Sequence, residues 1–399
     1  MLYYSSKTDK YFQYLLILFG FLYPLSVFAG NLLAVIILFL FFFLEDKRTK
    51  FFYLLHNKFF RAIAIFFLLH CFGMLWTDDL KRGLEIIRKM LEFAVLLPVL
   101  MMSMHKKNID IYINSFIAAS SLILLFSYLI SFEIIPPFKT ATIENPTPFM
   151  THITHGPFIA FAAYISLNRI IDKFLSKDYI SYIYIFLFLA LSINVFITGG
   201  RAGQVVYIIL LFTTLVQNFG LKIKILIIGM FLSLMIAISA YQYSGIFRDR
   251  ADYVINELKA YEETGNFQSS IGTRLLFLEN SLSIIKNNFL LGVGTGDFPQ
   301  EYSRYNKINS PNGFESTNPH NMYLLQMAQF GIVGLLSLIA IYYYQIKCRI
   351  KDDKFLSNLG LGMMVYFLVI NFSDSYLLGH FTSFQFTFFA AFLYQSEEH

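Results

Sequence analysis

The sequence predicts an all-α polytopic integral membrane protein with about twelve transmembrane helices and one large, mainly helical outer loop between the ninth and the tenth. Hydrophobic residues make up 56% of its 399 residues and charged residues only 14%, which excludes an ordinary globular protein. Apolar runs of about 17–25 residues can cross a bilayer as helices. Such runs lie near 11–29, 31–45, 59–76, 90–104, 111–132, 153–170, 179–197, 202–218, 222–241, 321–346, 356–372 and 377–394.

Lysine and arginine residues indicate the orientation of these runs, because short loops rich in them stay in the cytoplasm. Alternate loops, counted from the N-terminus, carry basic residues, so both termini are predicted to be cytoplasmic. The stretch DDLKRGLEIIRK at 78–89 is an exception, with four basic residues on the outer side. The net charge of +5 is therefore mainly a topology signal and does not indicate nucleic-acid binding. This pattern divides the chain into 1–241, the outer loop 242–319 and 320–399.

The outer loop is predicted to contain two helices and a tight turn. The stretch RDRADYVINELKAYEETG predicts a first helix that ends near Gly265. The stretch LLGVGTGDF predicts a tight turn, because its glycine spacing does not fit a dinucleotide fingerprint. The stretch SSIGTRLLFLENSLSIIKNNF predicts the second helix, capped by Ser269 or Ser270, with an apolar face of Leu275, Leu278, Leu282, Ile285 and Phe289.

Two histidines and two cysteines were considered as metal ligands. His152 and His155, three residues apart between the fifth and sixth runs, have the minimum spacing for two ligands on one helix face. No acidic or cysteine partner accompanies them, so we expect interfacial or substrate contacts and no metal. Cys71 lies in an apolar run and Cys348 in an inner loop, so neither indicates a disulfide framework or a metal site.

Two arginines lie on the outer side. Arg201 follows the seventh run, against the positive-inside preference, and Gly200 and Gly203 beside it would let a ligand approach the backbone. Arg274 lies in the first turn of the second loop helix, where the helix dipole disfavours a cation by about 0.3–1 kcal/mol. Arg201 could simply mark a loop, and Arg274 could form a structural ion pair with Glu279, although their spacing of five residues is poor for it. A shared anion would account for both positions.

His320 lies in the stretch NPHNMYLLQMAQFGIVG at the start of the tenth run. Asn318 is the predicted helix cap, which places His320 in the first turn at the outer interface, where the ring tends to stay neutral and can accept a proton. The alternative is an interfacial histidine bonded to Asn321 or to a loop carbonyl. Paired guanidinium groups suit a diphosphate and a base activates a hydroxyl, so these residues predict displacement of a lipid-linked diphosphate by an alcohol.

At these residues the chain resembles the O-antigen ligase and polymerase superfamily. The matching stretches, in order, are TGGRAGQ, GTRLLFLENSLSIIKNNFLLGVGTGDF and NPHNMYLLQMAQFGIVG. The resemblance implies that Arg201, Arg274 and His320 are catalytic, and that the large loop and the active site face the periplasm from the bacterial inner membrane. It implies transfer of a glycan from undecaprenyl diphosphate without nucleotide, metal or other cofactor. Further substrate contacts are expected from Gly200, Asn321, His152 and His155.

The family includes several activities, and the ligase is expected here. The ligase transfers O-antigen to lipid A-core, and its size and single large outer loop fit this chain. A polymerase of O-antigen or capsule repeat units would use the same donor, whereas protein O-oligosaccharyltransferases usually have an additional C-terminal region, which we do not expect here. The non-enzyme alternative is a polysaccharide-lipid transporter, which would carry ionisable residues or broken helices within the membrane. The expected partners are therefore the lipid-linked glycan, lipid A-core and membrane lipids, with no nucleic acid.

Overall fold

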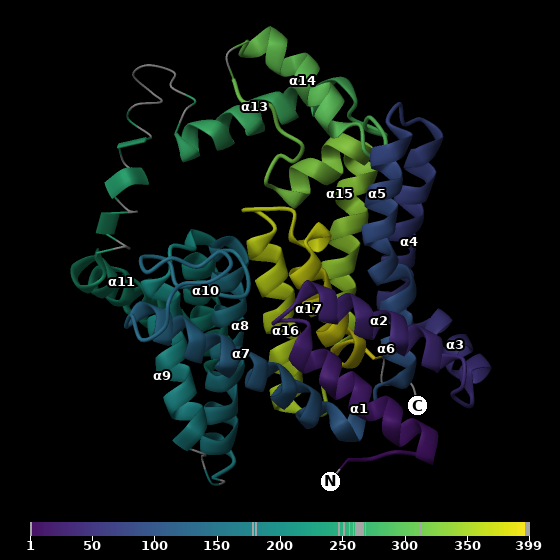
Figure 1. The fold of residues 1–399 in the computed structure, drawn as a ribbon, viewed down its shortest axis with the longest axis vertical. Helices are drawn as coiled ribbons and strands as arrows, with labels where there is room; N and C mark the ends of the chain where they lie inside the picture. Colours follow the sequence, from purple (N-terminus) through teal and green to yellow (C-terminus); the bar gives the residue numbers. More distant parts are fainter. Residues whose placement is uncertain are drawn as a thin grey trace.

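The regular secondary structure in the part of the chain that the structure describes is all helical, and no strand occurs there. The computed structural model describes residues 2–177, 179, 182–245, 248–249, 252–254, 256–257, 259, 267, 269–311 and 313–395. The predicted first loop helix, 248–265, therefore lies largely outside the described residues. The helices before the loop (Figure 1) are α1 (Lys7–Leu22), α2 (Val27–Phe41), α3 (Lys47–His56), α4 (Lys58–Phe72), α5 (Leu80–Leu91), α6 (Leu97–Ser103), α7 (Ile109–Ser131), α8 (His152–Leu175), α9 (Tyr182–Ile197), α10 (Arg201–Phe219) and α11 (Ile223–Tyr243).

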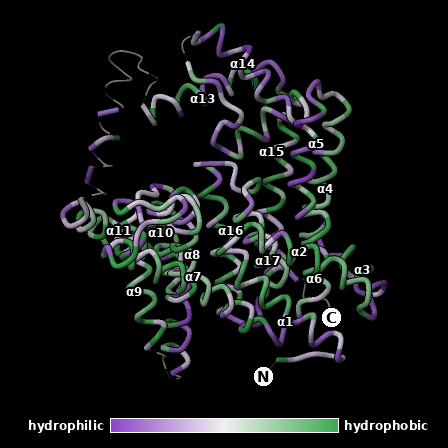
Figure 2. The backbone as a smooth tube through the Cα atoms, in the orientation of Figure 1, coloured by the Kyte–Doolittle hydropathy of each residue, from purple (hydrophilic) through white to green (hydrophobic). Residues whose placement is uncertain are grey.

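The loop and C-terminal helices complete the described fold. Figure 1 places α13 and α14 at the end of the molecule opposite the N-terminus, and Figure 2 shows that hydrophilic residues are concentrated there, whereas the helices of the bundle are mostly hydrophobic. These remaining helices are α13 (Ser270–Asn287), α14 (Phe298–Asn309), α15 (Met322–Cys348), α16 (Lys354–Ile370), the 3-10 turn η4 (Tyr376–Leu378) and α17 (His380–Leu393).

Several helices have the length and composition of membrane spans. Within the described residues there are five such helical segments, and three further apolar helices are shorter. The total of about twelve spans stays a prediction. The five long segments are Lys58–Leu75, Lys106–Ser131, Arg201–Phe219, Ile223–Tyr243 and Met322–Cys348, and the shorter helices are Val27–Phe41, Tyr182–Ile197 and Lys354–Ile370.

The stretch 78–89 is not the loop that its charges suggested. Asp79 caps α5 by accepting a hydrogen bond from the backbone N–H of Arg82 at 3.0 Å, and the helix continues through a π-helical segment, Glu92–Leu96, into α6. Gly83, Ile86 and Met90 form its buried face, so its basic residues lie on the remaining surface of a helix. The basic side chains of 78–89 therefore start from the ordered backbone of α5 and not from a loop.

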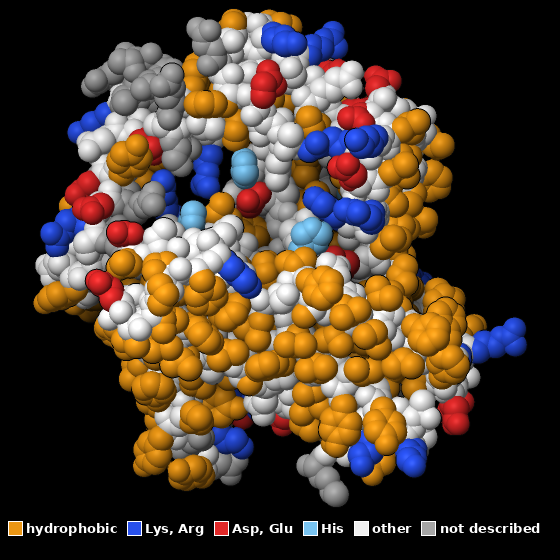
Figure 3. Space-filling view, viewed as in Figure 1, with side chains coloured by type: hydrophobic (Ala, Val, Ile, Leu, Met, Phe, Trp, Pro, Cys, Tyr) orange, Lys and Arg blue, Asp and Glu red, His pale blue; other side chains and the backbone are white. Residues whose placement is uncertain are grey.

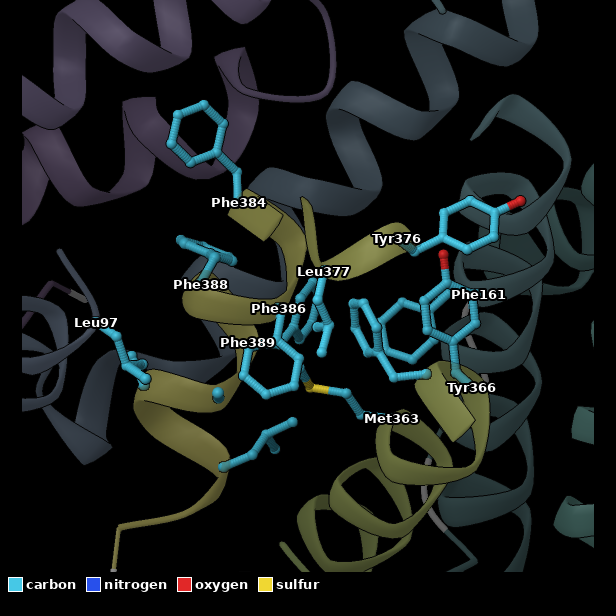
Figure 4. Packing of buried hydrophobic residues seen from close by; sticks show 14 of the residues in the cluster. Leu97, Phe161, Met363, Tyr366, Tyr376, Leu377, Phe384, Phe386, Phe388 and Phe389 are labelled. Atoms are coloured by element: carbon cyan, nitrogen blue, oxygen red, sulfur yellow. The ribbon is translucent and has the colours of Figure 1, made fainter. Parts of the chain in front are cut away.

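Aromatic side chains fill the core between α8, α16 and α17. Phe161 on α8 contacts Tyr366 on α16 and Phe389 on α17, with ring centroids 4.9 and 5.1 Å apart. Figure 4 shows these rings together with Leu377 and Tyr376 from η4. Such offset and edge contacts add to the energy of burial, and Tyr376 and Leu377 of η4 are buried beside this core.

The glycine-rich turn is docked on a break in α15. Gly331 has a φ of 61° and interrupts the helix, and Ile332 N–H donates to Phe289 O at 2.8 Å. Val293 and Gly294 N–H donate to Ala328 O and Gln329 O at 3.0 and 2.9 Å, so backbone groups around the break are paired with the turn. The predicted tight turn is confirmed by positive φ angles of 67°, 106° and 100° at Gly292, Gly294 and Gly296.

The predicted apolar face of α13 is wrong. The helix does begin after the cap Ser269, which accepts from Gly272 N–H at 2.9 Å. However, Leu278 and Leu282 are 37% and 50% exposed. The helix packs against α14 and α15 with a mixed face, because the polar side chains of Asn280 and Ser281 are buried beside apolar ones and Asn280 bonds to α14. Its buried side chains are Leu276, Phe277, Asn280, Ser281, Ile284 and Ile285.

Candidate functional site

His320 lies just before α15, not in its first turn. The helix begins at Met322, and Asn321 is its cap, accepting from the N–H groups of Tyr323 and Leu324 at 2.9 and 3.1 Å. The prediction that Asn318 is the cap is therefore wrong, because Asn318 instead accepts from His320 N–H at 3.1 Å. This bond belongs to a turn in which His320 has a φ of 50°, a left-handed conformation that costs about 1–2 kcal/mol.

Asp374, in the connection between α16 and η4, faces the imidazole of His320. Its Oδ1 lies 3.3 Å from His320 Nδ1, and the carboxylate also accepts from Ser375 N–H at 2.7 Å and from the Asn318 side chain at 3.2 Å. An ionised carboxylate can only accept, so its position beside Nδ1 favours the tautomer with the ring proton on that nitrogen. Nε2 is then left with its lone pair, and the His320 side chain is 41% exposed. The arrangement can accept a proton from an incoming hydroxyl.

Arg274 belongs to the helix that supports the same ring. Phe277, one turn further along α13, stacks on His320 with ring centroids 5.6 Å apart and an interplanar angle of 21°. Burial raises the pKa of the Tyr376 hydroxyl, and a hydrogen bond with Ser373 lowers it. The charge of Asp374 also raises this pKa, and the Arg274 guanidinium lowers it. Arg274 and Asp374 are thus both within electrostatic reach of Tyr376.

Arg201 is the first residue of α10, next to a close crossing with α8. Its neighbour Gly200 leaves no room for a side chain, because a Cβ there would lie 2.5 Å from His152 O. A Cβ on Gly203 would lie 2.4 Å from the backbone carbon of Gly156. The helix crossing therefore requires these glycines, and the expected contact of Gly200 with a ligand stays a prediction.

The two predicted histidines of α8 lie in different environments. His152 is the first residue of the helix and is half-buried. His155 is fully buried and its Nε2 lies 2.9 Å from Asn194 Oδ1 on α9, a packing position. Substrate contacts of His152, His155 and Asn321 stay predictions. Among the described residues, no group of three or more His, Cys, Asp or Glu is placed to hold a metal ion.

A series of contacts connects Gly200 beside Arg201 to His320 across four parts of the chain. Gly200 packs against the backbone of His152. The next residue, Ile153, accepts a hydrogen bond from Tyr376 Oη at 2.8 Å. Ser375 Oγ donates to Asn318 Oδ1 at 2.8 Å, and Asn318 holds the backbone of His320. Figure 3 shows basic, acidic and histidine side chains gathered around the hollow between the loop helices and the hydrophobic bundle.

A cavity of about 310 Å³ lies beside this network. Asn318 and Asp374, which hold His320, form part of its wall, and α5 contributes Arg82, Glu85 and Lys89. The sequence interpretation missed these α5 residues and Asp374 as site residues. The excess of basic residues at 78–89 could have indicated the α5 residues. No local pattern in the sequence marks Asp374 as a partner of His320.

The described chain is a helical protein with membrane-length segments. It carries a histidine–carboxylate pair, His320 and Asp374, near the helices of its large loop. Residues 186–339 match the family described as O-antigen ligase, which supports the resemblance to the O-antigen ligase superfamily. The matched region contains Arg201, Arg274 and His320. Asp374 and α5 lie outside it.

One relative adds a longer alignment. The chain is 26% identical over 216 residues to an uncharacterized protein of Haemophilus influenzae (strain ATCC 51907 / DSM 11121 / KW20 / Rd). The alignment covers 52% of this chain and 54% of that protein. The chain therefore spans about half the length of the curated relative that it matches.

Proposed function

We propose that the protein is a glycosyltransferase that transfers a glycan from undecaprenyl diphosphate to a hydroxyl of lipid A-core at the periplasmic face of the bacterial inner membrane. The O-antigen ligase match over 186–339 supports a transfer reaction of this kind. The observation that carries the proposal is the 3.3 Å contact between His320 Nδ1 and Asp374 Oδ1, since it leaves Nε2 as the proton acceptor.

The proposed reaction is a direct displacement. Nε2 of His320 takes the proton of the acceptor hydroxyl, whose oxygen then bonds to the anomeric carbon of the glycan. The bond from that carbon to the diphosphate oxygen breaks, and undecaprenyl diphosphate leaves with the electron pair, which inverts the anomeric configuration. Asp374 stabilises the imidazolium ion that forms.

Arg201 and Arg274 would hold the leaving diphosphate. A guanidinium group can bind phosphate oxygens with two parallel hydrogen bonds and neutralise the charge that builds up on them. Arg274 is exposed on α13 and Arg201 is half-buried at the start of α10, so the two arginines approach the site from the loop and from the bundle. In this proposal the donor already carries its leaving group, so no nucleotide is needed, and the two guanidinium groups neutralise the diphosphate in place of a metal ion.

The other functions differ in the acceptor or in the absence of a reaction. A repeat-unit polymerase would use a sugar hydroxyl of another lipid-linked glycan, and a protein O-oligosaccharyltransferase would use a peptide hydroxyl. A transporter predicts broken membrane helices, and α15 is broken at Gly331. That break is occupied by backbone hydrogen bonds to the glycine-rich turn, however, and so supports the loop structurally.

The test is a transfer assay with purified protein and undecaprenyl-diphosphate-linked glycan. Lipid A-core, lipid-linked glycan repeats and a pilin-like peptide are supplied separately, and both glycosylated product and released undecaprenyl diphosphate are measured. The proposal expects product only with lipid A-core. Product with lipid-linked repeats alone would identify a polymerase, product with peptide alone a protein glycosyltransferase, and no product with any acceptor would contradict an enzymatic role.

A further inference from the structure

The cavity beside His320 has a second wall that the proposed reaction does not yet use. Three residues of α5, spaced three and four apart, line the cavity from one face of the helix. They are Arg82, Glu85 and Lys89. The opposite wall includes Asn318, which bonds to the backbone of His320, and Asp374, which contacts its ring. The cavity therefore extends from the basic side chains of Arg82 and Lys89 to the residues in contact with His320, the proposed general base.

Neither basic residue of this wall lies within salt-bridge distance of a carboxylate in the described part of the chain, although Glu92 is within electrostatic reach of Lys89. Arg82 Nη2 donates only to the carbonyl of Thr317, at 3.4 Å, and no ion pair includes Arg82 or Lys89. Both residues are half-buried, so their charges are partly removed from water, and the single carboxylate of Glu85 among the lining residues of this wall leaves it with a net positive charge. Two cations in this position suit a dianion such as a phosphate group, which carries a charge of about −1.5 to −2 at neutral pH.

The acidic residues of the cavity suit sugar hydroxyls. Asp374 faces the cavity and Glu85 is exposed on α5, and carboxylates are strong acceptors for hydroxyl donors. The volume of about 310 Å³ is at the small end of the range for ligand sites, which fits a small sugar unit and excludes a long glycan. Cations and carboxylates on the same cavity therefore match a sugar that carries a phosphate.

The cavity adjoins the arginines assigned to the donor but is not lined by them, since Arg274 is within electrostatic reach of the lining residue Tyr376. Arg201 and Arg274 are not part of its lining, whereas three residues around His320 are: Asn318, Asp374 and Ser375. Donor and acceptor must meet at the base from different sides for a direct displacement, because the attacking oxygen and the leaving oxygen lie on opposite sides of the reacting carbon. The cavity is therefore on the acceptor side of His320 if the arginines hold the donor.

We propose that this cavity is the acceptor subsite and that it takes a phosphorylated sugar, with the phosphate held by Arg82 and Lys89 and a hydroxyl directed to His320. This inference rests on the proposed function. It explains why basic residues of 78–89 stand on the outer side, against the positive-inside preference. It also gives the acceptor a recognition element that lies outside the region of the O-antigen ligase match.

The test is a binding measurement without donor. The probes are a phosphorylated lipopolysaccharide core oligosaccharide and the same oligosaccharide after phosphatase treatment, each titrated against the full-length protein in lipid nanodiscs. The expected result is a Kd for the phosphorylated probe that is roughly ten- to hundredfold lower, the range of a hydrogen-bonded charge contact. Arg82→Gln and Lys89→Gln should each reduce this preference by roughly tenfold or more.

Lys81→Gln is the matched control, because Lys81 is exposed on the same helix and does not line the cavity. It removes the same charge and should keep the preference of the unchanged protein. Equal Kd values for the two probes, or the same preference in all three variants, would overturn the inference. If Arg82→Gln does not fold, Lys89→Gln against Lys81→Gln decides the outcome. A wild-type protein that transfers no glycan would instead contradict the proposed function, since binding is measured without transfer.

Discussion

Asp374 Oδ1 lies 3.3 Å from Nδ1 of His320, although the two residues belong to segments separated by all of α15 and α16. Asp374 is itself fixed by Ser375 N–H and by Asn318, so the carboxylate is held in position and not free to turn away. A carboxylate held beside Nδ1 favours the tautomer of His320 that leaves Nε2 free to accept a proton.

Asp374→Asn should lower kcat without a comparable change in the KM for the donor. The amide can donate a hydrogen bond to Nδ1, which favours the proton on Nε2 and removes the acceptor that the reaction needs. We expect a loss of roughly 10- to 10³-fold, part of the 10²–10⁴-fold effect typical of a general base. Asp352→Asn, an exposed carboxylate near the other end of α15, is the control. Steady-state kinetics in which both variants match the wild type would show that Asp374 does not position the base.

Arg201→Lys and Arg274→Lys should insert and fold but transfer glycan roughly tenfold or more slowly, because lysine keeps the charge and loses the paired hydrogen bonds. The measurement is kcat/KM for the lipid-linked donor. Arg304→Lys is the matched control, since Arg304 is exposed on α14 with Glu301 as its ion-pair partner at 3.6 Å. If both site variants have the wild-type kcat/KM, these arginines do not hold the diphosphate.

The sequence indicated Arg201, Arg274 and His320 because each lies in a short stretch with its own signal. The contact with Asp374 could not be predicted, since it depends on how α16 returns to the outer end of α15. The cap of α15 was placed three residues early because Asn-Pro is a common start signal, yet the Asn318 side chain serves the turn around His320. The buried face of α13 was missed because Asn280 and Ser281 lie on it, which apolar periodicity does not detect.

Gly331→Ala and Gly292→Ala should each destabilise the protein by at least about 2 kcal/mol, through the left-handed φ and through steric overlap. A Cβ on Gly331 would lie 2.4 Å from backbone atoms of Leu290, and one on Gly292 would lie 2.2 Å from the backbone carbon of Gln329. Thermal unfolding in detergent measures the effect. Gly245→Ala has open space around it and should change little. Equal melting temperatures for all three variants would mean that the turn does not hold α15.

The predicted topology can be tested with single cysteines. In a protein with Cys71→Ser and Cys348→Ser, Lys307→Cys on α14 should react in intact spheroplasts with a thiol reagent that cannot cross the inner membrane, because Lys307 is exposed and the loop is predicted to lie outside. Lys222→Cys, exposed between α10 and α11, should react only after the membrane is permeabilised. The reverse labelling pattern would place the site on the cytoplasmic side.

The most direct test of the account is the single-turnover rate of glycan transfer by His320→Ala, measured together with binding of the undecaprenyl-diphosphate-linked donor. A general base contributes typically about 10²–10⁴-fold, so the transfer step should slow on that scale. Donor binding should change much less, because the proposed donor contacts are Arg201 and Arg274. A His320→Ala protein that transfers glycan at the wild-type rate would show that the histidine is only part of the turn before α15.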